Sequence, residues 1–469
     1  MTAVRFWLGL WLGKIIGSVL KFLGKKGTTF PGVIAQKICP DIIKRLAVAF
    51  VEGTVIITGT NGKTTTNNLL ASILQTAGKK VAFNREGANM ITGITGTLLQ
   101  NTSFTGKAKA SLLLLEADEA TVPYLCRQLT PNLAVITNFF RDQLDRYGEL
   151  DTTIRLVKEA LPPCTGLILN ADDPLVAQIG GGRTGVFYYG TERLPVSRKE
   201  SKESREGRYC SRCGDELTYE LFHYGQLGIY QCLKCGFKRP QPYIEAQEVN
   251  RKETGISFRV DGDFRVNGDY EIPLQGYYNL YNALAAFCAA DRLGVSRENI
   301  RQGLISFVSD AGRMEQFSLQ SCLLTLTLVK NPTGFNQVIN TLAGMGKPLC
   351  LLIAINDLAA DGRDISWLWD VDFETFITKE VAINLVICSG LRADDMALRL
   401  KYAGFNEQQI VVKHELKEAM ALLEARQFLS EDAVFVLPTY TALFPLREIL
   451  TSKNLGKKPS SGQTKAECI

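Results

Sequence analysis

Histidine is scarce in this chain of 469 residues, which contains only two, His223 and His414. A mechanism that needs several catalytic histidines is therefore excluded within the chain. The formal net charge of +5 is too small an excess for this length to indicate a nucleic-acid partner by itself. With 46% hydrophobic and 22% charged residues, the composition is that of an ordinary globular protein. The length predicts roughly two or three domains.

The chain also lacks a long uncharged hydrophobic run near its N-terminus. Residues 6–23 are rich in Trp, Leu, Ile and Phe, but Lys14 and Lys21 interrupt them. The longest uncharged stretch, Phe6–Gly13, is far below the roughly 20 residues that span a bilayer. No small-residue cleavage site follows, so a signal peptide is not expected. We predict an amphipathic helix that packs on the body of the protein or, alternatively, lies on a membrane surface.

Most of the 12 cysteines are scattered singly in apolar surroundings, which is typical of reduced core residues in a cytoplasmic protein. The other four form two C-x-x-C pairs separated by 18 residues, and a glycine follows each pair. The glycines allow a tight turn around a metal. This spacing predicts a closed, structural zinc site, in which His223 is not needed as a ligand. Its four thiolates are Cys210, Cys213, Cys232 and Cys235.

Short strand-like runs alternate with helical patterns along the chain. Apolar runs at 54–58, 112–115, 133–137 and 167–170 predict a parallel sheet with helices on both faces. A second α/β unit begins near Arg313, with strands expected at 323–329, 349–355, 385–389 and 433–437 in a doubly wound, Rossmann-like sheet. We expect a helical segment (1–50), a central domain (51–312) with an inserted ribbon (205–240), a C-terminal domain (313–455) and a disordered tail (456–469).

A phosphate-binding loop is the most specific local motif. It follows a strand and opens a helix, so that glycines let the backbone approach phosphates and the helix N-terminus faces the anion. Lys63 can reach the β- and γ-phosphates of ATP, and the Thr64 hydroxyl can bind Mg²⁺. The loop is a short variant, because Ile57 stands where the first glycine is expected; a Gly-rich turn without a ligand is the alternative. Its residues are Gly59, Thr60, Asn61, Gly62, Lys63, Thr64 and Thr65.

Two carboxylates, Glu116 and Asp118, end the strand at 112–115. The carboxyl edge of a parallel sheet is where ligands bind, and a carboxylate there can hold Mg²⁺ directly or through water. We place this role on Glu116. The alternative is a solvated strand end.

Several motifs occur in the order found in the Mur ligases, and the chain resembles that family from about Thr54 to Glu315. The resemblance implies an ATP-dependent ligase that activates a carboxylate as an acyl phosphate, with Lys63, Mg²⁺ and Arg313 neutralising charge. It also implies that Asn138 lies at the nucleotide or metal site and Asn282 on the adenine side. Besides the phosphate loop, the motifs are Thr137-Asn138 with Asp142-Gln-Leu-Asp145-Arg-Tyr-Gly148, Asn170-Ala-Asp172-Asp-Pro174, Gly276-x-x-Asn279-x-x-Asn282-Ala and Gly312-Arg313-Met-Glu315.

Departures from the amino-acid-adding Mur ligases indicate a particular branch. Gln143 stands where those enzymes usually carry histidine, and the cysteine-rich insert and several other stretches resemble the MurT family. The resemblance implies amidation of the D-Glu α-carboxyl group of lipid II to D-isoglutamine at the inner face of the plasma membrane. It further implies a heterodimer with a GatD-like glutaminase that releases ammonia from glutamine. The stretches are Asn84–Met90, Lys330–Phe335, Asn356–Asp370 and Thr439–Thr441.

In that resemblance the partner supplies the Cys and His of a triad and this chain supplies an aspartate, which orients the histidine. We place the role on Asp364, with Asp361 as the second choice. Asp364 could also cap a helix beginning at Ile365, and the two roles are compatible. Trp367 and Trp369 either anchor the partner or pack in the domain core.

Two other functions fit parts of the sequence. A stand-alone ligase of the Mur or folylpolyglutamate type would add an amino acid without a second chain. A nucleic-acid-binding ATPase would use basic residues of the ribbon as a reader, but no aromatic stacking pattern accompanies them. We therefore expect no nucleic-acid partner.

Overall fold

A computed structural model describes residues 2–23, 29–84, 88–141, 150–201, 205–252, 254–262, 266–308, 312–319, 322–429 and 432–452. The Asp142–Gly148 motif and the tail from residue 456 lie outside the described residues. The chain divides into two compact units. The first comprises residues 1–140, 149–273 and 277–307, and the second comprises 141–148, 274–276 and 308–469.

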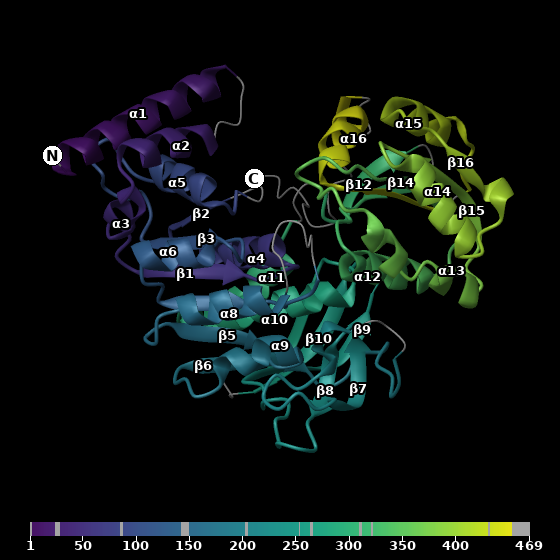
Figure 1. The fold of residues 1–469 in the computed structure, drawn as a ribbon, viewed down its shortest axis with the longest axis horizontal. Helices are drawn as coiled ribbons and strands as arrows, with labels where there is room; N and C mark the ends of the chain where they lie inside the picture. The colour runs from purple at the N-terminus through teal and green to yellow at the C-terminus, as the bar shows by residue number, and fades with distance from the viewer. Residues whose placement is uncertain are drawn as a thin grey trace, which may run out of the picture. The chain divides into compact units, whose positions relative to one another are not determined.

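The first unit is built on a nine-stranded sheet with the order β11-β10-β9-β6-β5-β4-β1-β3-β2 (Figure 1). The strands from β2 to β9 in this order are parallel, as predicted. The end β9-β10-β11 is antiparallel, a pairing that is open to strands that follow one another closely in the chain. The bounds are β1 Gly53–Thr58, β2 Val81–Phe83, β3 Leu112–Glu116, β4 Leu133–Ile136, β5 Gly166–Asn170, β6 Val186–Thr191, β9 Ile244–Arg251, β10 Ile256–Gly262 and β11 Gly268–Ile272.

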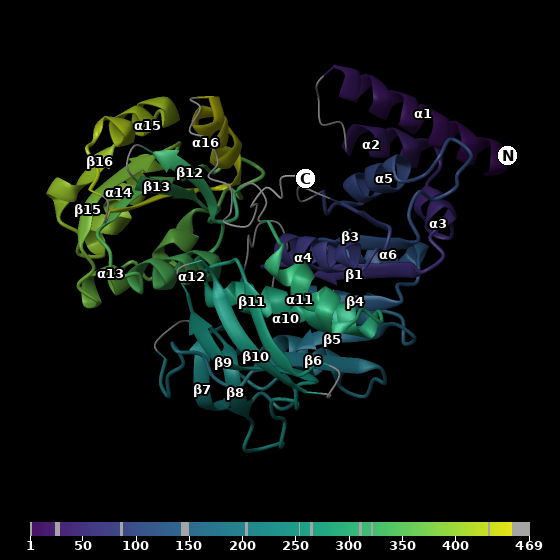
Figure 2. The same ribbon diagram turned by 180° about the vertical axis from the view of Figure 1, so that it is seen from behind.

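Helices cover both faces of this sheet. Helices α4, α10 and α11 pack together on one face, which is nearest the viewer in Figure 2, whereas α6 and α8 lie on the other. The two faces are covered because β1, β3, β4 and β5 are apolar on both sides and need two layers of helices to exclude water. The bounds are α4 Lys63–Thr76, α5 Ile91–Gln100, α6 Val122–Gln128, α8 Leu150–Ala160, α9 Pro174–Ala177, α10 Tyr277–Arg292 and α11 Arg297–Ile305.

The N-terminal segment forms three helices, α1 (Thr2–Phe22), α2 (Thr29–Ile38) and α3 (Ile42–Ala47). Helix α1 packs on α2 and α5, and the approach is close because Gly9 and Gly13 carry no side chain toward Ala35 and Leu99. The predicted helix on the body of the protein is present, but its outer face is apolar rather than polar. By length and composition Ala3–Phe22 could cross a membrane, a test that core helices and signal sequences also pass.

A ribbon is inserted between β6 and β9 and serves as the crossover that two parallel strands require. Its centre is the antiparallel hairpin β7 (Thr218–Tyr224) and β8 (Leu227–Gln231). A small apolar cluster joins the ribbon to the sheet through Ala177 and Tyr188.

The second unit contains a six-stranded sheet with the order β12-β13-β17-β14-β15-β16, in which only β12 is antiparallel among the described strands. Alternate residues of β14 enter two different apolar cores, so helices cover both faces of the sheet. The bounds are β12 Glu315–Leu319, β13 Cys322–Leu326, β14 Leu349–Ala354, β15 Ile383–Ser389, β16 Ile410–Val412, β17 Ala433–Pro438, α12 Pro332–Ala343, α13 Glu374–Thr378, α14 Ala393–Tyr402, α15 Leu416–Ala425 and α16 Tyr440–Ser452.

A candidate nucleotide site and a candidate metal centre

The phosphate loop connects β1 to α4 at the carboxyl edge of the first sheet. Gly59 and Gly62 have φ values of +122° and +84°, a region that favours glycine. A Cβ atom on Gly62 would lie 2.0 Å from Oδ1 of Asn282, so the missing side chain lets α10 approach the loop. The structure thus brings Asn282, which the sequence predicts on the adenine side, directly against the loop.

Lys63 opens α4 and is buried at this edge. Its Nζ donates to the carbonyl oxygens of Gly59 and Thr60 and forms a 3.1 Å ion pair with Glu119, whose side chain is also buried. The sequence reasoning missed Glu119. The spacing Glu116-Ala-Asp-Glu119 at the end of a strand was the available signal, because a carboxylate that is buried at a sheet edge needs a cation or hydrogen-bond donors beside it.

Glu116 is the last residue of β3 and is 1% exposed. Its Oε1 accepts a hydrogen bond from Asn89, and Oε2 has no hydrogen-bond partner among the described residues. A buried carboxylate oxygen without a donor is costly unless a cation or water meets it. Glu116 therefore fits the predicted Mg²⁺ site, for which the half-buried Thr64 at the start of α4 offers a hydroxyl oxygen.

Asn138, in the loop after β4, is bonded to the phosphate loop. Its Oδ1 accepts from the backbone N–H of Asn61 at 2.9 Å, and its Nδ2 donates to the Asn61 carbonyl at 3.0 Å. The hydroxyl of Thr137 donates to the same carbonyl. Thr60 also donates its backbone N–H to the carbonyl oxygen of Asn138. Asn138 thus shapes the loop as well as lying beside it.

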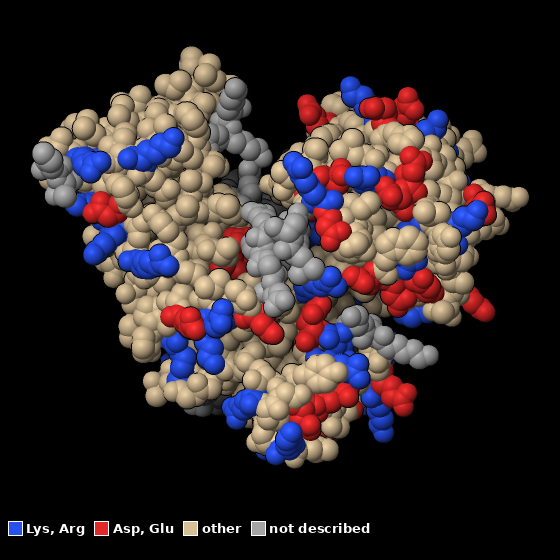
Figure 3. All heavy atoms as spheres, viewed as in Figure 1, with Lys and Arg blue, Asp and Glu red and all other residues tan. Residues whose placement is uncertain are grey.

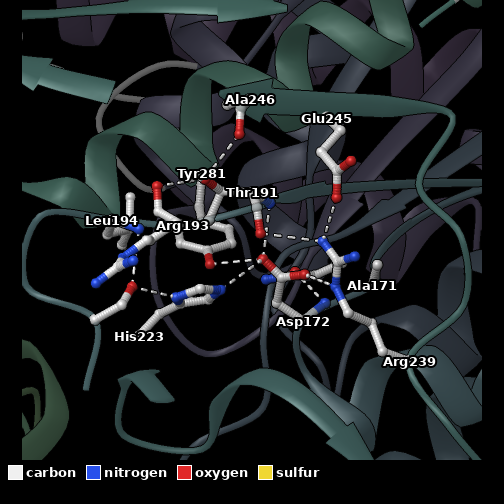
Figure 4. Close-up of polar contacts among 12 residues, drawn as sticks. Ala171, Asp172, Thr191, Arg193, Leu194, His223, Arg239, Glu245, Ala246 and Tyr281 are labelled. Atoms are coloured by element: carbon white, nitrogen blue, oxygen red, sulfur yellow. Dashed lines mark hydrogen bonds and ion pairs between the residues drawn. The ribbon is translucent and has the colours of Figure 1, made fainter. Parts of the chain in front are cut away.

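A buried polar network lies on the ribbon side of the sheet and centres on Asp172 (Figure 4). Its carboxylate accepts from Arg239 at 2.6 Å, from the Tyr281 hydroxyl at 2.7 Å and from the backbone N–H of Thr191. Burial alone would lower the pKa of Arg239, but the ion pairs with Asp172 and Glu245 raise it. This network ties the segment after the second cysteine pair, through Arg239, to α10, the helix that carries Asn282.

His223 points into the same network and lies outside the cysteine cluster. Its Nδ1 is 2.7 Å from the Ser197 hydroxyl, and burial lowers its pKa. The expectation that His223 is not a metal ligand agrees with this position. His414, by contrast, is exposed and bonded to Asp394.

The sulfur atoms of Cys210, Cys213, Cys232 and Cys235 lie within 4.8 Å of one another. The Cys210–Cys235 and Cys213–Cys232 sulfur atoms are each 3.5 Å apart. A tetrahedral thiolate site with metal–sulfur bonds of about 2.3 Å has edges of about 3.8 Å, so the four sulfurs could hold one metal ion. Gly214 and Gly236 have positive φ, which lets each knuckle fold back on its cysteine.

The second sheet gathers other candidate residues at its carboxyl edge. Asp361 is buried; it accepts the backbone N–H of Thr441 at 2.8 Å and the Thr441 hydroxyl at 2.5 Å. Asn356, after β14, donates to the same hydroxyl, and its Oδ1 accepts from the Leu391 N–H. Asp361 therefore fixes the loop after β14 to the start of α16.

Asp364 is exposed and accepts the Ser366 N–H at 2.8 Å, which lowers the pKa of its carboxyl group. The short helical turn that follows begins at Ser366 and has Ile365 at its N-cap position, without a capping side chain. Asp364 therefore bonds to the first N–H of the turn but is not its N-cap, and the expected helix start at Ile365 is wrong. Trp367 packs against Phe335 in the core, whereas Trp369 is 53% exposed and contacts Tyr402. The core interpretation thus holds for Trp367 alone.

Arg313 belongs to the second unit and is half-buried in the turn just before β12. The turn before it is held by Glu315, which accepts from the Gly312 N–H and forms a two-pronged ion pair with Arg447. That Arg313 contacts the phosphates of ATP stays a prediction. Asn331, in another of the quoted motifs, caps α12 by accepting the Gly334 N–H.

Comparisons with known proteins show which family has this architecture. Family models match at residues 57–230, the Mur ligase middle domain, and at 328–443, the MurT ligase C-terminal domain. The MurT subunit of lipid II isoglutaminyl synthase (glutamine-hydrolyzing) from Staphylococcus aureus (strain COL) is 36% identical over 452 residues, covering 95% of this chain and 98% of that protein. The chain belongs to the MurT family. The MurT subunit from Streptococcus pneumoniae (strain ATCC BAA-255 / R6) is 35% identical over 456 residues, covering 96% and 98%.

Among solved structures, a pseudomurein peptide ligase type C from Methanothermus fervidus aligns with a TM-score of 0.65 and 24% identity, covering 86% of this chain and 78% of that one. MurF from Acinetobacter baumannii aligns with a TM-score of 0.64 and 17% identity, covering 91% and 80%. These likenesses confirm the predicted Mur-ligase fold. The roles of individual residues in this MurT-family chain stay predictions, which the geometry above sharpens.

Proposed function

We propose that this chain is the synthetase subunit of a lipid II isoglutaminyl synthase. It activates the α-carboxylate of D-Glu in the lipid II stem peptide as an acyl phosphate, and ammonia then attacks to give D-isoglutamine. The observation that carries the proposal is the sequence identity of 36% and 35%, over nearly the full length of the chain, to relatives named as that subunit. The phosphate loop, a buried lysine and a carboxylate with an unsatisfied oxygen at one sheet edge support ATP-dependent chemistry.

ATP with Mg²⁺ would supply the phosphoryl group, and phosphoryl transfer depends mainly on positioning and on neutralising charge. Lys63 brings a cation to the loop, and its ion pair with Glu119 holds the ammonium group at this edge. Thr64 and Glu116 offer oxygen ligands to Mg²⁺. Asn138 holds the loop in its curved form through its two bonds to Asn61. To Arg313 we assign the neutralisation of the remaining negative charge on the phosphates.

The ammonia must come from another chain. In the described part of this chain, His223 is buried in the Asp172 network and His414 pairs with Asp394, so neither is set beside a nucleophilic cysteine. We propose a GatD-like glutaminase partner in a heterodimer, with Asp364 completing its triad. The exposure and the lowered pKa of Asp364 keep it ionised and within reach of a partner, whereas the buried Asp361 is already committed to Thr441.

We propose that the four-cysteine cluster holds Zn²⁺ and stabilises the ribbon, because the sulfur spacing fits a closed tetrahedral site. Elemental analysis of the purified chain is expected to find one zinc per chain, and Cys213→Ser is expected to lose it and to unfold at lower temperature. Retained zinc in that variant would contradict the assignment. Cys164→Ser, at an exposed cysteine outside the cluster, is the control.

We also propose that the chain works in the cytoplasm with the outer face of α1 on the inner surface of the plasma membrane. Trp7, Trp11, Ile15 and Val19 are between 36% and 51% exposed along α1. No Asp or Glu precedes Asp41, and Figure 3 shows a mainly uncharged surface with Lys and Arg over α1 and α2. Apolar area combined with cations favours anionic lipid.

Vesicle sedimentation tests this contact. The wild type is expected to bind phosphatidylglycerol vesicles, and Trp11→Glu with Ile15→Glu is expected to bind more weakly. Val51→Glu, at an apolar residue that is 85% exposed outside α1, is expected to bind as the wild type does. Equal binding by all three proteins would contradict the proposal.

The amidation itself is tested with purified protein, lipid II and ATP. The wild type is expected to amidate lipid II with ammonium alone, and with glutamine only when the candidate glutaminase is added. If ATP is consumed with an amino acid while ammonium gives no amidated lipid II, the stand-alone ligase replaces this proposal.

A further inference from the structure

The hairpin of the ribbon reaches the loop that supports the phosphate site. Its tip is Gly225-Gln226, between β7 and β8. Gln226 is fully buried, and all the polar atoms of its side chain are bonded. Nε2 donates to the carbonyl oxygen of Phe139 at 2.6 Å and to Oδ1 of Asp173 at 3.1 Å. Oε1 accepts from the backbone N–H of Gly207 at 3.3 Å.

The same three-residue strip that Gln226 contacts also holds the phosphate loop. Asn138, Phe139 and Phe140 follow β4 in sequence. On one side, Asn138 bonds to Asn61, and the backbone N–H of Phe140 donates to the Thr60 hydroxyl at 3.1 Å. On the other side, the Phe139 N–H donates to Oδ2 of Asp173, and the Phe139 carbonyl accepts from Gln226. The strip is thus clamped between the ribbon tip and the phosphate loop.

We propose that Gln226 is a positioning residue for the nucleotide site: the inserted ribbon braces the Asn138–Phe140 strip and thereby sets the shape of the phosphate loop. The inference rests on the proposed use of ATP by this loop. Gln226 touches no reacting atom and acts through Phe139 on Asn138. The folded ribbon and nucleotide affinity are consequently coupled.

Gln226→Met tests the brace, because methionine is of similar length and flexibility but donates no hydrogen bond. The dissociation constant for Mg-ATP, measured by calorimetry well below the unfolding temperature, is expected to rise about ten-fold, the size of one net hydrogen bond. In the ammonium-driven reaction the KM for ATP is expected to rise while kcat stays nearly unchanged, because the reacting atoms are untouched.

Tyr230→Phe is the matched control. It removes another buried hydrogen bond from the same hairpin to the body, from the Tyr230 hydroxyl to the Ala171 carbonyl at 3.1 Å, and leaves the bonds from Gln226 to Phe139 and Asp173 in place. Both variants are expected to lose thermal stability, but only Gln226→Met is expected to weaken Mg-ATP binding. Equal weakening in both variants, or none in Gln226→Met, would overturn the inference.

Hydrogen exchange on the wild type tests the same coupling without a substitution, because coupling between two sites is reciprocal. Mg-ATP is expected to slow exchange in residues 224–227 as well as in 59–66, and to leave residues 210–216 unchanged. Protection confined to 59–66 would overturn the inference and leave the proposed function standing. A wild type that binds no Mg-ATP would overturn the proposed function itself.

Discussion

Both sheets carry their candidate residues at the same place, the carboxyl edge of their parallel strands. The two edges differ in what occupies the N-terminus of the helix that begins there. In the first unit α4 begins after Gly62, and its N-cap makes no side-chain hydrogen bond among the described residues. In the second unit the first turn of α16 is already occupied, because the Asp361 carboxylate accepts both the backbone N–H and the hydroxyl of Thr441.

This difference explains why one edge suits a phosphate and the other does not. A helix N-terminus attracts an anion, and in α16 the protein supplies its own anion. The second unit thus also has a sheet with an apolar core on each face, but its carboxyl edge fixes the loop that carries Asp364. The carboxyl edge of the first sheet holds the ammonium group of Lys63, which is paired with Glu119, and that of the second sheet carries the exposed carboxylate of Asp364.

The largest expected effect is at the first edge. Lys63→Met is expected to reduce both the glutamine-driven and the ammonium-driven reactions on the order of 10³-fold, because a cation that stabilises the transferring phosphoryl group is lost. ADP release in the two assays measures it. Lys79→Met, at a half-exposed lysine beyond the other end of α4, is the control and is expected to leave both rates unchanged.

A substitution at the carboxyl edge of the second sheet is expected to change the glutamine-driven rate without changing the ammonium-driven rate. Asp364→Asn is expected to lower the glutamine-driven rate on the order of 10²-fold or more, since a triad aspartate orients and stabilises its histidine, and to spare the ammonium-driven rate. Glutamate release by the paired subunits measures the effect. Asp361→Asn is the companion: it is expected to lower the unfolding temperature. If Asp361→Asn alone separates the two reactions, the role belongs to Asp361.

A pair of glycines tests how tightly the first edge is packed. Gly62→Ala is expected to weaken Mg-ATP binding about ten-fold or more, because its Cβ atom would meet Asn282 at 2.0 Å in addition to the cost of a positive φ. Gly78→Ala carries the same backbone cost at φ +76° with nothing within 4 Å. Equal nucleotide affinity in the two variants would show that contact with Asn282 has no role.

The smallest expected effect concerns the hydrogen bond between Thr441 and Asp361 at the carboxyl edge of the second sheet. Thr441→Val is expected to reduce the free energy of unfolding by about 1–3 kcal/mol, because Asp361 loses a buried donor, and to spare the ammonium-driven kcat. Thermal denaturation measures it. Thr451→Val, at an exposed threonine later in α16, is expected to change the free energy by less than about 0.5 kcal/mol.

Local patterns in the sequence were enough to predict much of the molecule. The phosphate loop, the cysteine pairs and the apolar strands at 112–115 and 349–355 each depend on residues close together in the chain, and each element is present. The antiparallel end of the first sheet was not predicted, since alternation marks a strand but says little about the direction of its neighbour.

Tertiary structure alone decided the remainder. The pairing of Lys63 with Glu119, separated by 56 residues, and of Gln226 with Phe139, separated by 87, depends on which loops meet at a sheet edge. Packing also gave different surroundings to two aspartates of one short segment, because Asp361 is buried and bonded to Thr441 whereas Asp364 is exposed. Sequence thus determined which chemical groups the chain carries, and packing decided which of them are buried, paired or presented to a partner.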